Sequence, residues 1–380
     1  MNLALGAVCA SLLLSSPSEP PPTGTPDAPP EAICVRAMLD GGLRLSGDIP
    51  DIGLGPRFEL SRTTAGFGLQ LDRAAGVEVE LDMVRTGGAA SYLGVEGEAF
   101  VPRLRLLQVH GSWARGGLGV SAGLIGNLWV SEANRGHGFR FVAPSVGEEL
   151  GFFFRSDLGL RVSWVSPKRF AHLSLAVQSG EGGDRRERNS GKNLSFLAVL
   201  RPLALLDENL GGRLEFGVLA RDGSVTSGVV RDHRGAFFVR GDIGPVRLGI
   251  EGLKAWGLQG EGQREPLALS LWASYEGALP LRAFGRLDLF SDDPSDPAFG
   301  SLQARTFVGL PIPFKGDRRP LTVGIEHLLR HAGEQSQALA GAEGLQTSHT
   351  ISLHVHGRLH VAAKVAALPS PAKPDKEKRQ

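Results

Sequence analysis

The residues best suited to chemistry near the C-terminus of this sequence are three histidines. His354, His356 and His360 fall on one strand-like run, with Arg358 between the last two. Side chains two apart on a strand share a face, so paired imidazoles could share a metal ion or titrate near neutral pH. No cysteine or carboxylate in that run completes a ligand set. We therefore predict no metal site there and interpret the run as a polar strand face.

Two catalytic-type motifs overlap in the glycine-rich run at 117–123. GLGVSA matches the dinucleotide fingerprint GxGxxA, and GVSAG, which contains Ser121, matches the nucleophile elbow GxSxG. Both motifs require a strand that turns directly into a helix, whereas this run keeps alternating between apolar and small or polar residues. The sequence therefore predicts no catalytic residue and no cofactor.

A cluster of charged side chains lies in one long polar segment, residues 127–157. Glu132, Arg135, His137 and Arg140 fall within nine residues that also contain two glycines. If the segment folds into a barrel, these side chains line its narrowest point and set charge selectivity. If it caps the mouth, they are ordinary surface charges. The sequence leaves both interpretations open.

Five arginines occupy the polar register of strand-like runs: Arg161, Arg213, Arg247, Arg305 and Arg358. In a barrel they would point into the water-filled lumen and favour anions. Alternatively, they pair with neighbouring acids such as Glu215 and Glu251 and have no selective role.

The runs that must position these residues alternate with a period of two. In VEVELDMV (77–84), apolar residues alternate with Glu78, Glu80 and Asp82. Successive strand side chains point to opposite faces, so one face is acidic and the other apolar. The pattern recurs from Gly66 to Val361 in runs of about ten residues, the length that a tilted strand needs to cross a membrane.

The connections between these runs differ in length. Short ones at 166–170, 242–245 and 277–280 alternate with long ones at 180–192, 222–234 and 257–266. Short turns on one side and long loops on the other are typical of outer-membrane barrels. Roughly five strands precede the segment 127–157 and eleven follow it, about 16 in all, enough to leave an aqueous channel. The sequence predicts an all-β, antiparallel transmembrane barrel with short periplasmic turns and longer external loops.

The domain organisation follows from composition. Residues 1–16 are predicted to be a signal peptide, 17–52 a Pro-rich spacer and lead-in, 53–362 the barrel, and 363–380 a charged tail. Signal removal leaves Cys34 as the one cysteine, so no intramolecular disulfide is expected. Lys and Arg number 41 against 40 Asp and Glu, so no global field favours nucleic acid.

The central stretch LRLLQVHGSWARGGLGVSAGLIGNL (104–128) resembles a strand pair of the phosphate-selective porins, the porin O and P type. The runs RSDLGLRVSW and HLSLAVQSGEGG resemble the continuation after the inward-folding loop of that family. The resemblance covers about Gly66 to Gly183 and implies a homotrimeric outer-membrane channel constricted by its long loop. Two features depart from the family: a tract of closely spaced basic residues is not evident, and the chain ends in PSPAKPDKEKRQ instead of an aromatic residue.

The sequence thus predicts a porin in the outer membrane of a Gram-negative-type cell, with no enzymatic activity. Its expected partners are small hydrophilic or anionic, phosphate-like solutes, outer-membrane lipid and two further copies, with the segment 127–157 as the constriction. Two alternatives belong to other classes. One is a plugged barrel acting as an enzyme or adhesin, for which Ser121 is the one serine in a nucleophile-like context. The other is a soluble periplasmic all-β binding protein.

Overall fold

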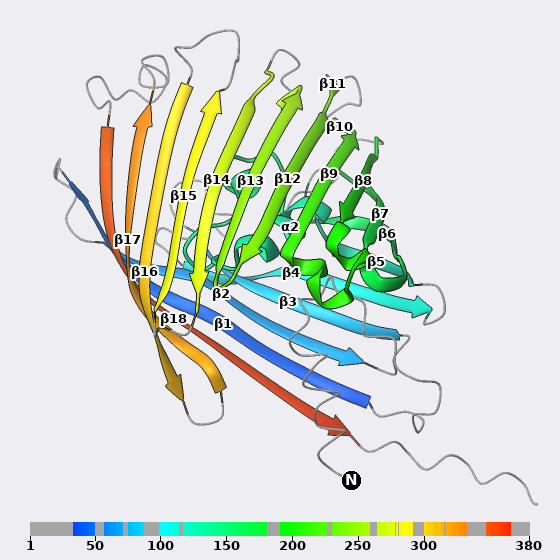
Figure 1. Ribbon diagram of the computed structural model, residues 1–380, viewed down its shortest axis with the longest axis horizontal. Coiled ribbons are helices and arrows are strands. Elements are labelled where there is room, and N and C mark those ends of the chain that lie inside the picture. Colours follow the sequence, from blue (N-terminus) through cyan, green and yellow to red (C-terminus); the bar gives the residue numbers. More distant parts are fainter. Residues whose placement is uncertain are drawn as a thin grey trace, which may run out of the picture.

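The computed structural model describes the chain from residue 33 to residue 365. It leaves out residues 50–56, 71–74, 87–98, 114–116, 181, 183–190, 226–229, 259–263, 278, 280, 292–299, 315–316 and 333–346. Sixteen antiparallel strands close into one barrel (Figure 1). The predicted signal peptide, the Pro-rich part of the lead-in and most of the charged tail lie outside the described residues. Among the described residues, no helix is long and apolar enough to cross a membrane.

Five strands precede the long polar segment and eleven follow it, as the alternation predicted. The first five are β1 (Ile33–Ile49), β2 (Arg57–Gln70), β3 (Ala75–Thr86), β4 (Ala99–Trp113) and β5 (Leu118–Gly126). The next six are β6 (Ser156–Val165), β7 (Ala171–Gln178), β8 (Asn193–Leu200), β9 (Leu214–Asp222), β12 (His233–Ile243) and β13 (Val246–Trp256). The last five are β14 (Leu267–Glu276), β15 (Arg282–Ser291), β16 (Gly300–Phe314), β17 (Asp317–Ala332) and β18 (Thr347–Val365).

The barrel begins earlier than the sequence indicated. β1 starts at Ile33, inside the segment assigned to the lead-in, so the predicted boundary at residue 53 is wrong. The register shift between Asp40 and Gly42 against β2 places the extra residue in β2, so β1 itself keeps its alternation. Gly41 and Gly47 occupy the register of the exposed Leu39, where other strands carry apolar side chains, and this weakens the pattern in the sequence. β1 pairs along its whole length with β18, from Ile33 opposite Val365 to Ile49 opposite His349. This pairing removes both free edges of the sheet.

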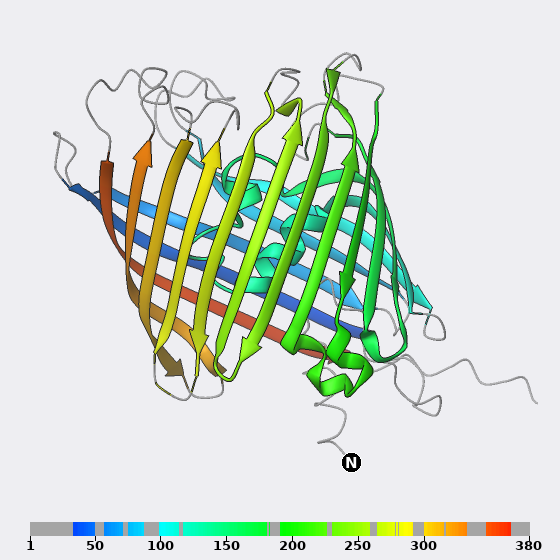
Figure 2. The ribbon, with the colours of Figure 1, turned by 45° about the horizontal axis from the view of Figure 1, so that its top comes forward.

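The remaining elements lie in the connections. A two-stranded ribbon, β10 (Ser224–Val225) and β11 (Val230–Arg231), follows β9. Short 3-10 helices are η1 (Pro167–Arg169), η2 (Pro202–Leu205) and η3 (Glu208–Arg213). The connection between β8 and β9, which begins at Arg201, contains η2 and η3 and is longer than a tight turn. It lies at the short-turn end of the barrel (Figure 2). Two helices, α2 (Leu128–His137) and α3 (Val146–Glu149), follow β5.

The two faces of the barrel differ in chemistry. On β7, Leu175 and Val177 are exposed on the outer surface, whereas His172, Ser174 and Gln178 are buried inside. Exposed leucine, valine, isoleucine and phenylalanine side chains recur on this outer face around the barrel. A soluble binding protein would not present so much contiguous apolar surface to water. The outer face is suited to hydrocarbon.

An arginine on this outer face should therefore destabilise the barrel according to its depth. Leu175 lies near the middle of β7, and Leu200 is the last residue of β8. Leu175→Arg is expected to cost about 2–4 kcal/mol of unfolding free energy in lipid vesicles, and Leu200→Arg about 0–1 kcal/mol. Urea unfolding of the two variants measures the difference. Equal losses at both positions would contradict the assignment of this face to lipid.

Candidate functional site

The connection between β5 and β6, residues 127–155, lies inside the barrel and is called here the inner loop. Figure 2 shows its helices enclosed by the ring of strands, where they do not cap the mouth. α2 contacts β8, β13 and β14, and α3 contacts β14. The two interpretations left open by the sequence are therefore resolved in favour of the inward fold.

The helix in the inner loop has clear local causes. The side chain of Asn127 caps the N-terminus of α2 by accepting hydrogen bonds from the backbone N–H groups of Trp129 at 3.0 Å and Val130 at 3.3 Å. At the other end, Gly138 has φ +71°, and its N–H donates to the carbonyl of Asn134 at 3.3 Å. A left-handed residue at this position is the usual helix stop, and glycine adopts it without strain.

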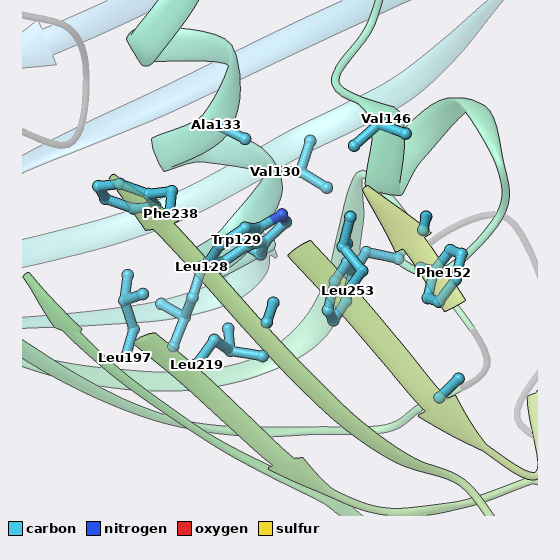
Figure 3. Close-up of a cluster of buried hydrophobic side chains, with 14 of the residues drawn as sticks. Leu128, Trp129, Val130, Ala133, Val146, Phe152, Leu197, Leu219, Phe238 and Leu253 are labelled. Carbon is cyan, nitrogen blue, oxygen red and sulfur yellow. The ribbon is translucent and has the colours of Figure 1, made fainter. Parts of the chain in front are cut away.

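The apolar side of the inner loop packs on an apolar patch of the lumen wall. Trp129 is fully buried, with its ring centroid 5.6 Å from that of Phe238 on β12 and 6.3 Å from that of Phe153. Figure 3 shows this cluster, in which loop residues meet Leu197, Leu219 and Leu253 from β8, β9 and β13. These strands are apolar on both faces at this level. The loop therefore covers lumen surface that water would otherwise contact.

A second apolar cluster extends the contact toward β16. Phe139 stacks on Phe284 of β15 with centroids 5.2 Å apart and meets the edge of Phe307 of β16 at 6.1 Å. Phe141 stacks on His356 of β18 at 4.3 Å. The inner loop is thus packed along the wall from β8 to β18.

Arginines of this wall bind the backbone of the inner loop. Arg240 donates to the carbonyl of Glu132 at 2.8 Å, and Arg247 donates to that of Gly136 at 3.2 Å. Arg305 donates to the carbonyl of Val142 at 3.1 Å, and Arg286 donates to that of Pro144. Arg282 places its guanidinium 4.9 Å from the ring centroid of Phe139. These contacts satisfy loop carbonyls that a buried segment could not leave unpaired.

Carboxylates of the loop complete the attachment. Glu149 accepts from Arg305 at 2.6 Å, from Gln303 at 3.0 Å and from Arg286. Burial alone would raise the pKa of Glu149, but Arg305 and Arg286 outweigh it and hold the pKa below its ordinary value. Glu148 similarly accepts from Arg140 at 2.8 Å and from Arg155 at 2.7 Å.

Glu132, one of the predicted loop residues, is buried at the centre of a charge network. It binds Arg135 at 2.6 Å and Arg240 at 3.1 Å. Burial would raise the pKa of Glu132, but the two arginines hold it well below the ordinary value. Glu215 of β9 joins the same network through Arg240 and through Arg201 at 2.6 Å. Glu132 is therefore an anchor for the loop, ionised at all ordinary pH values.

His137 is also buried, and its ring is held neutral. Its Nδ1 accepts a hydrogen bond from the backbone N–H of Phe139 at 3.0 Å. Burial, with Arg286 and Arg140 nearby, lowers the pKa of His137 to about 3. This histidine therefore carries no charge at neutral pH and does not contribute to charge selectivity.

Three arginines of the inner loop keep part of their side chains exposed. Arg135, Arg140 and Arg155 each have a relative side-chain exposure of 21%. The loop is attached to the wall around β13, and β3 lies eight strands away in the ring of sixteen. Arg155 reaches Asp82 on β3. The inner loop therefore also contacts the part of the wall that contains β3.

The strand arginines predicted from the polar register have different positions. Arg247 and Arg305 face the lumen and hold the loop, and Arg161 donates to the hydroxyl of Ser121 at 3.1 Å. Arg213 was wrongly assigned to a lumen face. It ends η3 and is exposed, because β9 begins only at Leu214. Arg358 belongs to β18, and its side chain lies outside the described residues.

Sequence reasoning missed several residues that bind the loop. Arg240 and Arg286 occupy the same lumen register that pointed to Arg247 and Arg305, within runs that looked mainly apolar. Glu148 and Glu149 lie in the second half of the polar segment 127–157, outside the predicted cluster at residues 132–140. A search for every charge on the lumen register would have found the two arginines.

The described histidines considered for a metal each bind a carboxylate. His354 binds Glu326 at 2.6 Å, and His356 binds Asp40. In the part of the chain that the structure describes, no three His, Cys, Asp or Glu side chains are placed to hold a metal ion. Ser121 faces Arg161, with no histidine among its described hydrogen-bond partners.

One serine does bind a histidine. The hydroxyl of Ser174 lies 3.0 Å from Nε2 of His172, whose Nδ1 is 3.9 Å from the Glu132 carboxylate. That last distance exceeds a hydrogen bond. Glu132 is already bound by two arginines, and Ser174 is buried. The arrangement therefore lacks the oriented base that nucleophilic catalysis needs.

Several solved structures of outer-membrane proteins have a fold similar to that of this chain. The anion-selective porin from Comamonas acidovorans matches with a TM-score of 0.59 at 12% identity, over 87% of this chain and 100% of that chain. OmpT of Vibrio cholerae, expressed in the outer membrane, matches with a TM-score of 0.55 at 8% identity, over 87% and 99%. The outer membrane channel DcaP of Acinetobacter baumannii matches with a TM-score of 0.54 at 11% identity, over 86% and 97%.

No protein-family model and no curated protein matches the sequence. At these identities the structural likeness establishes the fold alone. The closed ring of sixteen strands, the apolar outer face and these likenesses agree. The chain folds as a transmembrane β-barrel like those of these outer-membrane proteins.

Proposed function

We propose that this protein is a porin of the outer membrane of a Gram-negative-type cell, a passive diffusion channel for small hydrophilic solutes. The observation that carries the proposal is the inner loop, which lies inside a sixteen-stranded barrel, packs on the wall from β8 to β18 and also binds β3 through Arg155 and Asp82. Barrels of this size enclose an aqueous lumen, and a loop folded inside it narrows it. Transport of this kind requires no catalytic group.

The charges on the inner loop support a weak anion preference. Arg135, Arg140 and Arg155 retain exposure on the lumen side, whereas the carboxylates that pair with them, Glu132, Glu148 and Asp82, are less exposed. An exposed positive charge beside the diffusion path attracts anions and repels cations. The anion-selective porin among the similar structures is consistent with this preference. Phosphate-like solutes, suggested by the resemblance in sequence, belong to the same class.

Single-channel recording in a planar bilayer under a salt gradient tests the proposal. The purified protein is expected to give stepwise conductance with a reversal potential of anion-selective sign. A folded, inserted protein without steps would favour a plugged barrel instead. Steps with cation selectivity would retain the channel and remove the anion preference.

Arg135→Gln combined with Arg140→Gln should shift the reversal potential toward cations. Each exposed charge acts on an ion at contact with about 1 kcal/mol in water, favourably on an anion and unfavourably on a cation, so the anion-to-cation permeability ratio should fall by at most about thirtyfold per charge. Arg213→Gln is the matched control, because this exposed arginine belongs to η3 and lies outside the lumen. An unchanged reversal potential in the double variant, or the same shift in the control, would contradict the assignment.

A homotrimer is the assembly proposed for this channel. One of the similar structures is described as the trimer form of OmpT of Vibrio cholerae. The closed barrel presents an apolar outer face that either lipid or a second copy can cover. Mass measurement of the protein in mild detergent distinguishes a trimer from a monomer.

A further inference from the structure

A row of buried polar side chains lies on the lumen face at the long-loop end of β7, β8, β9 and β12. Gln178 opposes Asn193 across β7 and β8, and Arg221 opposes Arg234 across β9 and β12. Ser195 opposes Arg221 across β8 and β9 and so connects the two pairs. All five residues are at most 5% exposed. None of them binds the inner loop in the contacts described above.

Two arginines face each other directly in this row. Like charges at opposed positions of an antiparallel pair destabilise the sheet. Asp232 lies between them, with its carboxylate 2.7 Å and 2.9 Å from Nη2 of Arg234 and 3.6 Å from Nη2 of Arg221. A single carboxylate therefore serves two guanidinium groups and binds only one of them closely.

A second carboxylate near the row is already occupied. Asp157 of β6 acts electrostatically on Arg221. Its oxygens accept hydrogen bonds from the backbone N–H groups of Leu158 at 2.8 Å and Gly180 at 2.7 Å, and from the hydroxyl of Ser179. Asp157 thus offsets charge without supplying the missing hydrogen bonds.

Six buried donor atoms of this row have no hydrogen-bond partner in the described part of the chain. They are Nε and Nη2 of Arg221, Nε and Nη1 of Arg234, Nε2 of Gln178 and Nδ2 of Asn193. The amide of Asn193 is oriented by the backbone N–H of Ser224, which donates to its oxygen at 3.2 Å and leaves the nitrogen unpartnered. Buried donors are almost always satisfied in native proteins, so a concentration of six indicates a missing acceptor.

We propose that this row is a binding site for a small oxyanion, such as phosphate, sulfate or a carboxylate. The unpartnered side-chain atoms of these four residues are all donors, four of the six in guanidinium groups, and they outnumber the one unpartnered acceptor beside them, Oδ1 of Asp232. An oxyanion supplies several acceptor lone pairs together with negative charge, and the planar fork of arginine matches its geometry. A cation has no acceptor to offer these groups. The inference rests on the proposed function, because the channel admits the ion to the lumen.

The direct test is a crystal of the wild-type protein grown with selenate, whose selenium scatters anomalously. An anomalous peak within hydrogen-bond distance of both Arg221 and Arg234 is the expected result. Density for water alone, or no density, at saturating selenate would overturn the proposal. This measurement needs no variant, so it stands even where a substitution disturbs folding.

Binding in solution gives the energetic test. Phosphate replaces chloride at constant ionic strength, and the thermal unfolding temperature of the protein in detergent is followed. A ligand that binds the folded state alone raises this temperature with its concentration. Phosphate also stabilises proteins without specific binding, so only the difference between proteins is informative. Arg221→Gln and Arg234→Gln should each weaken binding at least tenfold.

Two further variants sharpen the comparison. Arg234→Lys keeps the charge but removes the fork, and it should also weaken binding. Arg330→Gln removes an exposed arginine of β17 far from the row and should bind phosphate like the wild type. Equal stabilisation of all these proteins by phosphate would overturn the proposal.

The outcomes separate this site from the channel itself. If selenate binds at the row but bilayer recordings show no steps, the channel proposal fails and the site stands. If steps appear and the row holds no selenate, the site alone is rejected. Conductance steps are expected to persist in Arg221→Gln, because the inner loop does not depend on that residue.

Discussion

Trp129→Ala is expected to lower the unfolding free energy by about 3–5 kcal/mol and to loosen the inner loop from the barrel wall. The indole is fully buried between Phe153 of the loop and Phe238 of β12. Its removal leaves a cavity that rigid strands on one side cannot close. The loop, which is held on that side, should then sample positions away from the wall.

Two measurements check this prediction. Urea unfolding in lipid vesicles gives the loss of stability, and bilayer recording should show larger and noisier steps because the lumen is less obstructed. Trp256→Ala is the matched control, since this tryptophan lies on the outer face and is 43% exposed. Trp256→Ala should lower the unfolding free energy much less than Trp129→Ala and leave the size of the conductance steps unchanged. Equal losses in the two variants would show that Trp129 does not hold the loop.

Arg305→Met is expected to cost about 3 kcal/mol, near the lower end for a broken buried ion pair. Arg305 binds Glu149 and Glu326 at 2.6 Å each and also the carbonyl of Val142. The expected loss of unfolding free energy is near the lower end of the range because both carboxylates keep another partner. Glu149 keeps Arg286, and Glu326 keeps His354. The variant removes the guanidinium contact of the loop with β16 and its link to the network that reaches the β17–β18 pair.

The pH dependence of this loss is a sharper test than its size. The folded pKa of Glu149 is depressed below its ordinary value of 4.5, so its contribution is present above pH 4.5 and is lost as pH falls through the folded pKa. Removing Arg305 reduces that contribution. The difference between wild type and variant should therefore shrink as pH falls from 7 toward 3.

Two controls accompany this titration. Glu149→Gln should cost less in the Arg305→Met background than in the wild type, because the two residues are coupled; the loss that remains belongs to the contacts of Glu149 with Arg286 and Gln303. Arg213→Met, which removes an exposed arginine of η3, should show no pH-dependent difference. A difference for Arg305→Met that stays constant with pH would exclude the ion pair as its cause.

The architecture was predictable because lipid imposes a simple constraint. Every strand must be apolar outside, and the period of two follows from strand geometry alone. VEVELDMV forms part of β3, and the eleven strands after the inner loop appear where the alternation placed them. β1 was missed because Gly41 and Gly47 stand where its outward apolar side chains should be, although its pairing with β18 is continuous.

The candidate site was predictable only in part. Glu132, Arg135, His137 and Arg140 were recognised as a charged cluster, but their roles depend on which partners the fold supplies. Burial makes Glu132 an anchor and His137 a neutral ring, whereas Arg135 and Arg140 retain exposure. Arg213 lies one residue before β9, at the end of η3, so the lumen register of the strand does not apply to it.

The sequence by itself determined the class of fold, the number of strands and which side chains share a face, because these depend on neighbours one or two positions apart. Only the tertiary structure decided that the inner loop lies against the wall from β8 to β18, and that Arg240, Arg286 and Arg305 bind it. Those contacts join residues more than a hundred positions apart. Their energies depend on burial and on opposed charges that exist only once the barrel has closed.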